Sequence, residues 1–164
     1  MTPEPNHLME LPRKILIGND VIYQLGSFIR DLNDKATKVI VISGNTVRAR
    51  VGEECVDALD GSSLKHKWIE TPNASMNDIN SSQSIIKIEQ PNFIVGVGGG
   101  RSVDVAKMIS FNLNIPFISV PTSASHDGIS SPFVSIRGRD KPYSLKAHAP
   151  IGVIADTRLI SEAP

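Results

Sequence analysis

Short apolar runs alternate with longer amphipathic stretches along most of the chain. Five runs rich in β-branched residues are predicted as strands, at 13–17, 38–42, 64–69, 93–97 and 116–120. The run Lys38–Ile42 is apolar at nearly every position, as is typical of a strand buried on both faces of a parallel sheet. Helical periodicity marks the stretches between the strands, at 20–32, 46–59, 76–89 and 102–112. Repeated strand–helix units of this size predict right-handed crossovers and a parallel sheet with helices on both faces.

Polar side chains at the helix starts and apolar ones along the helices sharpen this prediction. Asp20 is expected to cap the helix 20–32, and Ser102 is expected to cap the helix 102–112. The apolar side of the helix 76–89 is predicted to consist of Ile79, Ile85, Ile86 and Ile88. The inward positions of the helix 102–112 are predicted to be Val103, Ala106 and Ile109.

The rhythm changes after Pro121. Phe133–Ile136 and Tyr143–Ala147 flank a polar turn and predict a β-hairpin outside the main sheet. Ile151–Ile154 is predicted as a last strand, with Asp156 as the N-cap of one more helix. The predicted fold class is therefore α/β, with a Rossmann-like parallel sheet flanked by helices and an added hairpin.

The composition excludes several classes of partner. Hydrophobic residues make up 40% and charged residues 21% of the chain, as in an ordinary globular domain. Lys plus Arg and Asp plus Glu both number 17, which gives no net charge to attract nucleic acid or a membrane surface. The single cysteine, Cys55, fits a reducing cytoplasm, and no apolar run reaches the length of a membrane span. We expect a cytoplasmic protein without a nucleic-acid or membrane partner.

Three consecutive glycines, Gly98, Gly99 and Gly100, lie between a predicted strand and a predicted helix. Glycine lets a backbone approach a pyrophosphate closely, and the free N–H groups of a helix start attract anions. The alternative is a tight turn without a ligand. A short strand-to-helix loop usually needs one glycine, so three in succession favour a dinucleotide pyrophosphate loop.

This loop departs from the usual dinucleotide fingerprint. Arg101 occupies the position of the third glycine, and no acid occurs between Asp104 and Asp127 to bind a ribose. Ribose contacts are then expected at the end of the second strand, where the segment 43–46 has hydroxyl and amide groups but no carboxylate. With Arg48 and Arg50 nearby, this predicts tolerance of both NAD and NADP, unless the two arginines only solvate a helix face.

A second polar loop, 121–132, follows the fifth predicted strand. It is dense in hydroxyl groups and contains His126 and Asp127. Such a loop lies at the carboxyl edge of the sheet, where ligands bind in open α/β folds. A Ser/Thr-rich turn, with Asp127 bonded to its own backbone, is an equally good interpretation from composition alone.

Both loops resemble motifs of a known superfamily. Gly98–Lys107 followed by Pro121–Ser125 is similar to the superfamily of dehydroquinate synthase, glycerol dehydrogenase and iron-type alcohol dehydrogenase. Within it, Ser125–Pro132 resembles the signature of archaeal-type sn-glycerol-1-phosphate dehydrogenases. The order of elements from residue 13 to 164 is similar to the N-terminal nucleotide-binding domain of that family, preceded by a flexible segment, 1–12.

The resemblance implies a set of site residues. Asn45 corresponds to a position near the adenosine ribose, and Asp127 to a substrate contact. Asp104 and Lys107 are part of the motif, although their spacing also suits an ordinary pair on a helix surface. The implied cofactor contacts are Asn45, Gly98, Gly99, Gly100, Arg101, Ser102, Val103, Asp104, Thr122, Ser123, Ala124, Ser125 and Ser131.

The resemblance also implies NAD(P)-dependent reduction of dihydroxyacetone phosphate to sn-glycerol 1-phosphate for ether phospholipids, by a homo-oligomer. In the family, zinc is held by an aspartate and two histidines of a helical C-terminal domain. These 164 residues are expected to lack that domain, the zinc site and the catalytic residues, because the four histidines show no zinc-binding spacing. Lys146 and His148 are candidates for the substrate phosphate, or else line a solvated hairpin edge. The alternatives are a glycerol dehydrogenase, a dehydroquinate synthase or a non-catalytic nucleotide-binding domain.

Overall fold

A six-stranded sheet, parallel throughout, forms the centre of the computed structural model, which describes residues 9–71, 73, 75–124, 127–137 and 142–163. Its strand order is β1-β8-β5-β4-β2-β3. The strands are β1 (Lys14–Gly18), β2 (Lys38–Ser43), β3 (Lys65–Glu70), β4 (Phe93–Gly98), β5 (Phe117–Pro121) and β8 (Gly152–Asp156). The predicted α/β class and every predicted strand of the sheet are confirmed.

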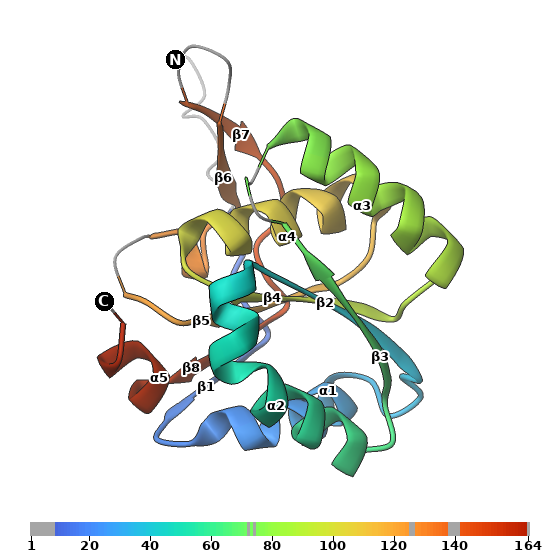
Figure 1. Ribbon diagram of the computed structural model, residues 1–164, viewed down its shortest axis with the longest axis vertical. Helices are drawn as coiled ribbons and strands as arrows, with labels where there is room; N and C mark the ends of the chain where they lie inside the picture. The colour runs from blue at the N-terminus through green and yellow to red at the C-terminus, as the bar shows by residue number, and fades with distance from the viewer. Residues whose placement is uncertain (1–8, 72, 74, 125–126, 138–141, 164) are drawn as a thin grey trace, which may run out of the picture.

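Helices cover both faces of this sheet (Figure 1). The α-helices are α1 (Leu25–Leu32), α2 (Asn45–Gly61), α3 (Met76–Glu89), α4 (Gly100–Leu113) and α5 (Thr157–Ser161). Residues of α1 and α2 pack on one face, and residues of α3 and α4 on the other. In β2, Val39 and Val41 face the first layer whereas Ile40 and Ile42 face the second. The unbroken apolar run of this strand thus follows from burial on both sides.

The predicted hairpin is confirmed as β6 (Phe133–Arg137) and β7 (Pro142–Lys146), an antiparallel pair outside the main sheet. Val134 and Ile136 join the same apolar cluster as α4. With the sheet on one side and the hairpin on another, α4 is buried continuously from Val103 to Ser110. The predicted inward positions are buried, but this helix buries more than one face.

Helix α3 has the predicted bounds but not the predicted apolar side. Ile79, Ser82 and Ile86 are buried, whereas Ile85 is 40% and Ile88 84% exposed. The buried residues are spaced by three and four positions and form one stripe. The prediction that all four isoleucines face inward was therefore wrong. Ile85 and Ile88 lie off this stripe, and Ser82 takes a place on it.

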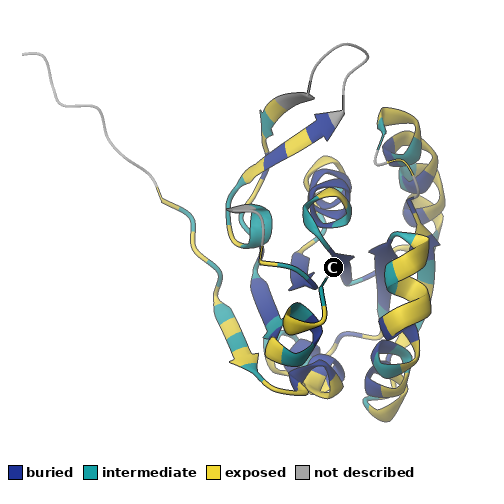
Figure 2. Cartoon of the chain, turned by 60° about the vertical axis from the view of Figure 1, so that its left-hand side comes forward, coloured by how far each residue is buried: buried dark blue, intermediate teal, exposed yellow. Residues whose placement is uncertain are grey.

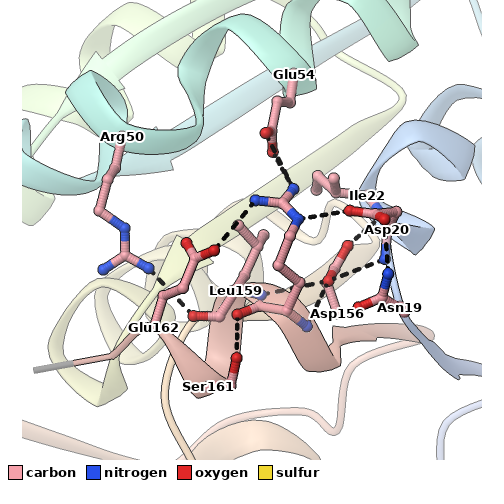
Figure 3. Close-up of polar contacts among 10 residues, drawn as sticks. Asn19, Asp20, Ile22, Arg50, Glu54, Asp156, Leu159, Ser161 and Glu162 are labelled. Carbon is pink, nitrogen blue, oxygen red and sulfur yellow. Dashed lines mark hydrogen bonds and ion pairs between the residues drawn. The ribbon is translucent and has the colours of Figure 1, made fainter.

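The start of the first predicted helix, 20–32, also differs. A 3-10 turn, η1 (Val21–Gln24), precedes α1, and Asp20 has φ 56° and makes no side-chain cap. The carboxylate of Asp156 accepts the backbone N–H groups of Ile22 (2.9 Å) and Asp20 (3.3 Å) instead. It also caps its own helix through Arg158 N (3.0 Å) (Figure 3), as predicted. A cap supplied from 134 residues away leaves no signal in the local sequence.

In the described part of the chain, no helix has both the length and the apolar content to cross a membrane.

Candidate cofactor-binding site

The carboxyl ends of β2, β4 and β5 bring three loops together at one edge of the sheet. A Cβ atom built on Gly99 would lie 3.3 Å from the hydroxyl of Ser123 in the loop after β5. A Cβ atom on Gly44, after β2, would lie 3.8 Å from the hydroxyl of Ser102. The N–H of Thr122 donates to the carbonyl of Gly98 (2.9 Å). The glycine loop thus lies between the two segments predicted to help it hold a dinucleotide.

Backbone geometry explains the glycines in this loop. Gly98 has φ +145°, and a Cβ atom there would lie 2.9 Å from Cβ of Ser102. Gly99 follows in an extended conformation as the N-cap of α4, and Gly100 is the first residue of the helix. Ser102 is not the N-cap that we predicted, because the helix begins two residues earlier. The helix start is therefore backbone alone, without a side chain in front of it.

The uncapped start of α4 lies beside a second uncapped helix start, that of α2. Among the described residues, neither α4 after Gly99 nor α2 after Gly44 receives a side-chain cap. By contrast, Ser75 and Asp156 cap α3 and α5. First-turn N–H groups need a partner from outside the helix. At the starts of α2 and α4, adjacent at the sheet edge, an anionic group such as a pyrophosphate can supply it.

The other predicted cofactor contacts on α4, residues 101–104, differ in how far they are exposed. Arg101 is exposed and Ser102 half-buried, whereas Val103 and Asp104 are buried. Val103 packs in the core, and its N–H donates to the carbonyl of Gly99 (3.1 Å). The Oδ2 atom of Asp104 accepts the N–H of Ser135 in the hairpin (2.9 Å). The side chains of these two residues support the loop from inside, and their contact with a cofactor stays a prediction.

Lys107, on the same helix, is only 1% exposed. Its ammonium group donates to the carbonyls of Gly128 (2.7 Å), Ser131 (2.6 Å) and Phe133 (3.1 Å). It lies 3.9 Å from the carboxylate of Asp104. Asp104 and Lys107 are thus not a pair on a helix surface: they attach the second polar loop and the hairpin to α4.

The end of β2 holds the predicted ribose contact and one residue that we missed. Asn45 is exposed as the first residue of α2. Parallel pairing places Glu70 of β3 beside Ser43, and its carboxylate accepts a hydrogen bond from Arg48 (2.6 Å). Arg50 donates to the carbonyl of Leu159 (3.1 Å). The end of β2 thus lies next to a carboxylate, that of Glu70, whose charge is paired with Arg48. Only the register between β2 and β3 could have revealed that Glu70 lies there.

The second polar loop is placed only in part. Thr122 is buried, Ser123 is half-buried and Ala124 is exposed. Ser131 is half-buried, and its hydroxyl accepts the N–H of Phe133 (3.1 Å). Ser125 and His126 lie outside the described residues. Asp127 begins a short 3-10 turn, η2 (Asp127–Ile129), but its side chain is not among those described.

His148, one candidate for the substrate phosphate, lies far from the glycine loop. Its ring packs edge-on against Phe111 (4.8 Å between centroids), in the last turn of α4, whereas the glycine loop begins that helix. Its Nδ1 is 3.6 Å from the carboxylate of Glu10. Lys146, the other candidate, is exposed at the end of β7. The structure does not bring His148 to the candidate site.

Two other kinds of chemistry find no support in the described residues. Cys55 is fully buried in α2, and burial raises the pKa of its thiol to about 12, so it is not a ready nucleophile. The described His, Cys, Asp and Glu residues include no group of three or more that could hold a metal ion. The candidate site is thus a glycine-lined, backbone-rich cradle without a described metal centre.

The comparisons with known proteins agree with a dinucleotide-binding fold of one particular class. Residues 16–164 match the family model described as iron-containing alcohol dehydrogenase, and the chain belongs to that family. A glycerol dehydrogenase from Schizosaccharomyces pombe superposes with a TM-score of 0.86 at 23% identity, over 97% of this chain and 41% of that one. An NADH-dependent butanol dehydrogenase from Thermotoga maritima has the same TM-score at 20% identity, over 97% and 46%. At such identities the likeness establishes the fold alone.

Sequence relatives narrow the class further. The chain is 45% identical over 159 residues to a glycerol-1-phosphate dehydrogenase [NAD(P)+] from Nitrosopumilus maritimus, covering 97% of this chain and 44% of that protein. It is 47% identical over 162 residues to the enzyme of the same description from Cenarchaeum symbiosum, covering 99% and 45%. The chain therefore spans less than half the length of these curated relatives.

Proposed function

We propose that this chain is the cofactor-binding part of a cytoplasmic, NAD(P)-dependent glycerol-1-phosphate dehydrogenase. The reaction is the reduction of dihydroxyacetone phosphate to sn-glycerol 1-phosphate, for ether phospholipid synthesis. Relatives of that description, at 45% and 47% identity over nearly the whole chain, support the proposal. The observation that carries it is the uncapped start of α4 behind Gly98–Gly100, facing Ser123.

The cradle fits a dinucleotide on physical grounds. Gly99 leaves open the space beside Ser123 that a Cβ atom would occupy, so the pyrophosphate can approach the first-turn N–H groups of α4. Asn45, at the start of α2, would contact the adenosine ribose, and the hydroxyls of Thr122, Ser123 and Ser131 would lie along the other side. The bound nicotinamide supplies the hydride, while these residues bind and orient it.

Paired charges at the end of β2 support the use of both cofactors. The hydrogen bond between Arg48 and Glu70 leaves neither a lone carboxylate to repel the 2′-phosphate of NADP nor an unpaired Arg48 to attract it. We therefore expect similar dissociation constants for NADH and NADPH. Replacing Arg48 by Met should weaken NADPH binding more than NADH binding, because the charge of Glu70 would then be uncompensated.

We assign zinc to the proposed whole enzyme and not to any site among the described residues. The described residues offer no set of ligands for it, so we derive no step of the reaction through a metal. Asp127 is proposed to bind a substrate hydroxyl.

A charge placed at the helix start tests the cofactor site. Gly99 is the N-cap of α4, and Asp is a favourable N-cap, which offsets the close approach of the new Cβ atom to the hydroxyl of Ser123 (3.3 Å), so Gly99→Asp should leave the thermal midpoint nearly unchanged. The same carboxylate would repel a pyrophosphate, and we expect NADH affinity, followed by fluorescence titration, to fall at least tenfold. Ser75→Asp at the cap of α3 is the matched control and should leave NADH binding unchanged. Absence of NADH and NADPH binding by the unaltered chain would contradict the proposal.

A chimaera tests the reaction. The chain, joined to the part of the Cenarchaeum symbiosum enzyme that follows the matched region, should reduce dihydroxyacetone phosphate with NADH or NADPH. A chelator should abolish this activity and added zinc restore it. Oxidation of unphosphorylated glycerol in place of sn-glycerol 1-phosphate would instead favour a glycerol dehydrogenase.

A further inference from the structure

Lys107 occupies a place in the fold where an apolar residue would be expected. It lies on the buried stretch of α4 between the sheet and the hairpin, and only 1% of it is exposed. Burying an ammonium group is unfavourable unless its charge and its donors are satisfied. A residue that serves only packing would not carry this cost, which indicates a more specific task.

Its hydrogen bonds indicate what that task is. An ammonium group has three N–H donors. Three backbone carbonyls accept from Nζ at 2.6–3.1 Å, those of Gly128, Ser131 and Phe133. The three carbonyls lie within the six residues 128–133, from the 3-10 turn that begins with Asp127 to the first residue of β6. One side chain therefore sets the path of this segment relative to α4.

Asp104, one turn before Lys107 on α4, also joins this helix to the hairpin. Its carboxylate accepts the N–H of Ser135 in β6 and lies 3.9 Å from the ammonium group of Lys107. A cavity of about 200 Å³ lies beside these contacts, lined by Asp104, Gly128, Ser131, Phe133, Val134, Ser135 and Ser144. Beside this cavity, the loop and α4 are joined by polar contacts rather than by continuous packing.

These contacts join two functional segments through one rigid element. The first turn of α4 faces the proposed pyrophosphate site, and Lys107 lies two turns further along the same helix. We propose that Lys107 is a positioning residue that fixes the loop carrying Asp127 to the dinucleotide-binding helix, so that cofactor binding orders the substrate-binding segment. This inference rests on the proposed function, which it extends from the cofactor to the substrate side.

Backbone hydrogen exchange on this chain tests the proposal. Wild type, Lys107→Met and Lys107→Arg are compared without and with saturating NADH. In wild type, NADH should slow exchange in peptides covering 127–136. In Lys107→Met these peptides should exchange at least tenfold faster without cofactor, and the NADH-induced protection should be lost, while NADH affinity changes less than threefold. Lys107→Arg, which keeps a charge and several donors, should retain most of the protection.

The control is Lys87→Met on the exposed side of α3, which should behave like wild type throughout. Exchange in peptides of β2 and β4 reports global stability and should be nearly unchanged by Lys107→Met. The proposal is overturned if NADH binds to wild type without protecting 127–136, or if Lys107→Met exchanges there within twofold of wild type. A uniform rise in exchange across β2, β4 and the loop also overturns it, since Lys107 would then serve only general stability. Failure of wild type to bind NADH contradicts the proposed function instead, and the exchange without cofactor still tests the attachment of the loop.

Discussion

At the scale of single residues, Gly98 is constrained by its backbone conformation as well as by its neighbours. Its φ of +145° lies in a region that residues with side chains rarely adopt, and a Cβ atom would lie 2.9 Å from Cβ of Ser102. We expect Gly98→Ala to destabilise the chain by about 1–3 kcal/mol and to displace the first turn of α4, weakening NADH binding. Urea unfolding and fluorescence titration measure the two effects.

Gly61→Ala is the matched control for this prediction. A Cβ atom on Gly61, in the last turn of α2, would meet nothing within 4 Å. This variant should unfold at the same or a slightly higher urea concentration than wild type. Equal stability of Gly98→Ala and wild type would show that the loop relaxes without cost.

Sequence reasoning located the glycine loop but not the contacts that support it. Three consecutive glycines after a buried strand carry a strong local signal, and the loop lies where that signal predicted. The contacts of Lys107 and Glu70 leave no such local signal. Lys107 binds a segment 21–26 residues away, and Glu70 reaches Arg48 only because β3 pairs with β2. Ser102 was predicted as a cap because serine often caps helices; here the loop ends without a side-chain cap.

At the scale of elements, one buried carboxylate joins the first and last parts of the sheet. Asp156, at the end of β8, accepts backbone N–H groups of Asp20, Ile22, Arg158 and Leu159 (Figure 3). The neighbouring Arg158 side chain binds both carboxylate oxygens of Glu54 (2.9 and 3.0 Å). Asp156 thereby holds the starts of η1 and α5 in place.

Asp156→Ala should therefore destabilise the chain by about 2–4 kcal/mol, because four N–H groups lose their acceptor. Asp156→Asn, which keeps one acceptor oxygen, should lose less. Asp60→Ala is the control, since the Asp60 side chain is exposed and its one polar contact among the described residues is with the ring of His66; its effect should stay below about 0.5 kcal/mol. Urea unfolding provides all three values, and equal losses at positions 156 and 60 would contradict the assigned role.

The last turn of α3 is attached to the sheet through a carboxylate that titrates. Glu89 accepts hydrogen bonds from Lys67 (2.7 Å) and Lys38 (3.1 Å), and these lower its pKa below the ordinary value. A carboxyl group with a lowered pKa in the folded state adds stability above its unfolded pKa of about 4.3. That stability is lost as the pH falls through the folded pKa.

The difference in unfolding free energy between wild type and Glu89→Gln should therefore be constant near neutral pH and shrink in acid. Urea unfolding at a series of pH values measures it. Glu53→Gln is the control, because the side chain of Glu53, exposed on α2, has no hydrogen bond or ion pair with the described residues. A difference that grows toward acid would contradict the assigned direction of the pKa shift.

The positions of strands and helices were easier to predict from the sequence than the way these elements pack against one another. Alternation and apolar runs correctly placed every strand of the sheet and the hairpin, because burial on one or both faces imposes those patterns directly. The pattern could not show that β6 and β7 lie over α4, or which isoleucines of α3 face inward. Both depend on how elements pack against one another.

At the scale of the whole molecule, the edge of the sheet formed by β1 exposes apolar side chains in the described chain. β1 pairs only with β8 among the described strands, and its residues alternate between half-buried and exposed (Figure 2). Leu16 packs toward the layer that contains α1. Ile15 and Ile17 face the other way and are 55% and 67% exposed. An exposed edge strand with apolar side chains is a template for pairing with another chain.

We therefore predict that this chain self-associates through β1. Sedimentation velocity over a concentration series should show a reversible oligomer, because pairing of two β1 strands satisfies their outer backbone groups and covers Ile15 and Ile17. The double variant Ile15→Lys with Ile17→Lys should weaken association at least tenfold, since the added charges repel each other and resist burial. Ile88→Lys on α3 replaces a more exposed isoleucine, at 84%, away from this edge and should not change association. Equal weakening by the two variants would show that general surface hydrophobicity, and not the edge of β1, brings the copies together.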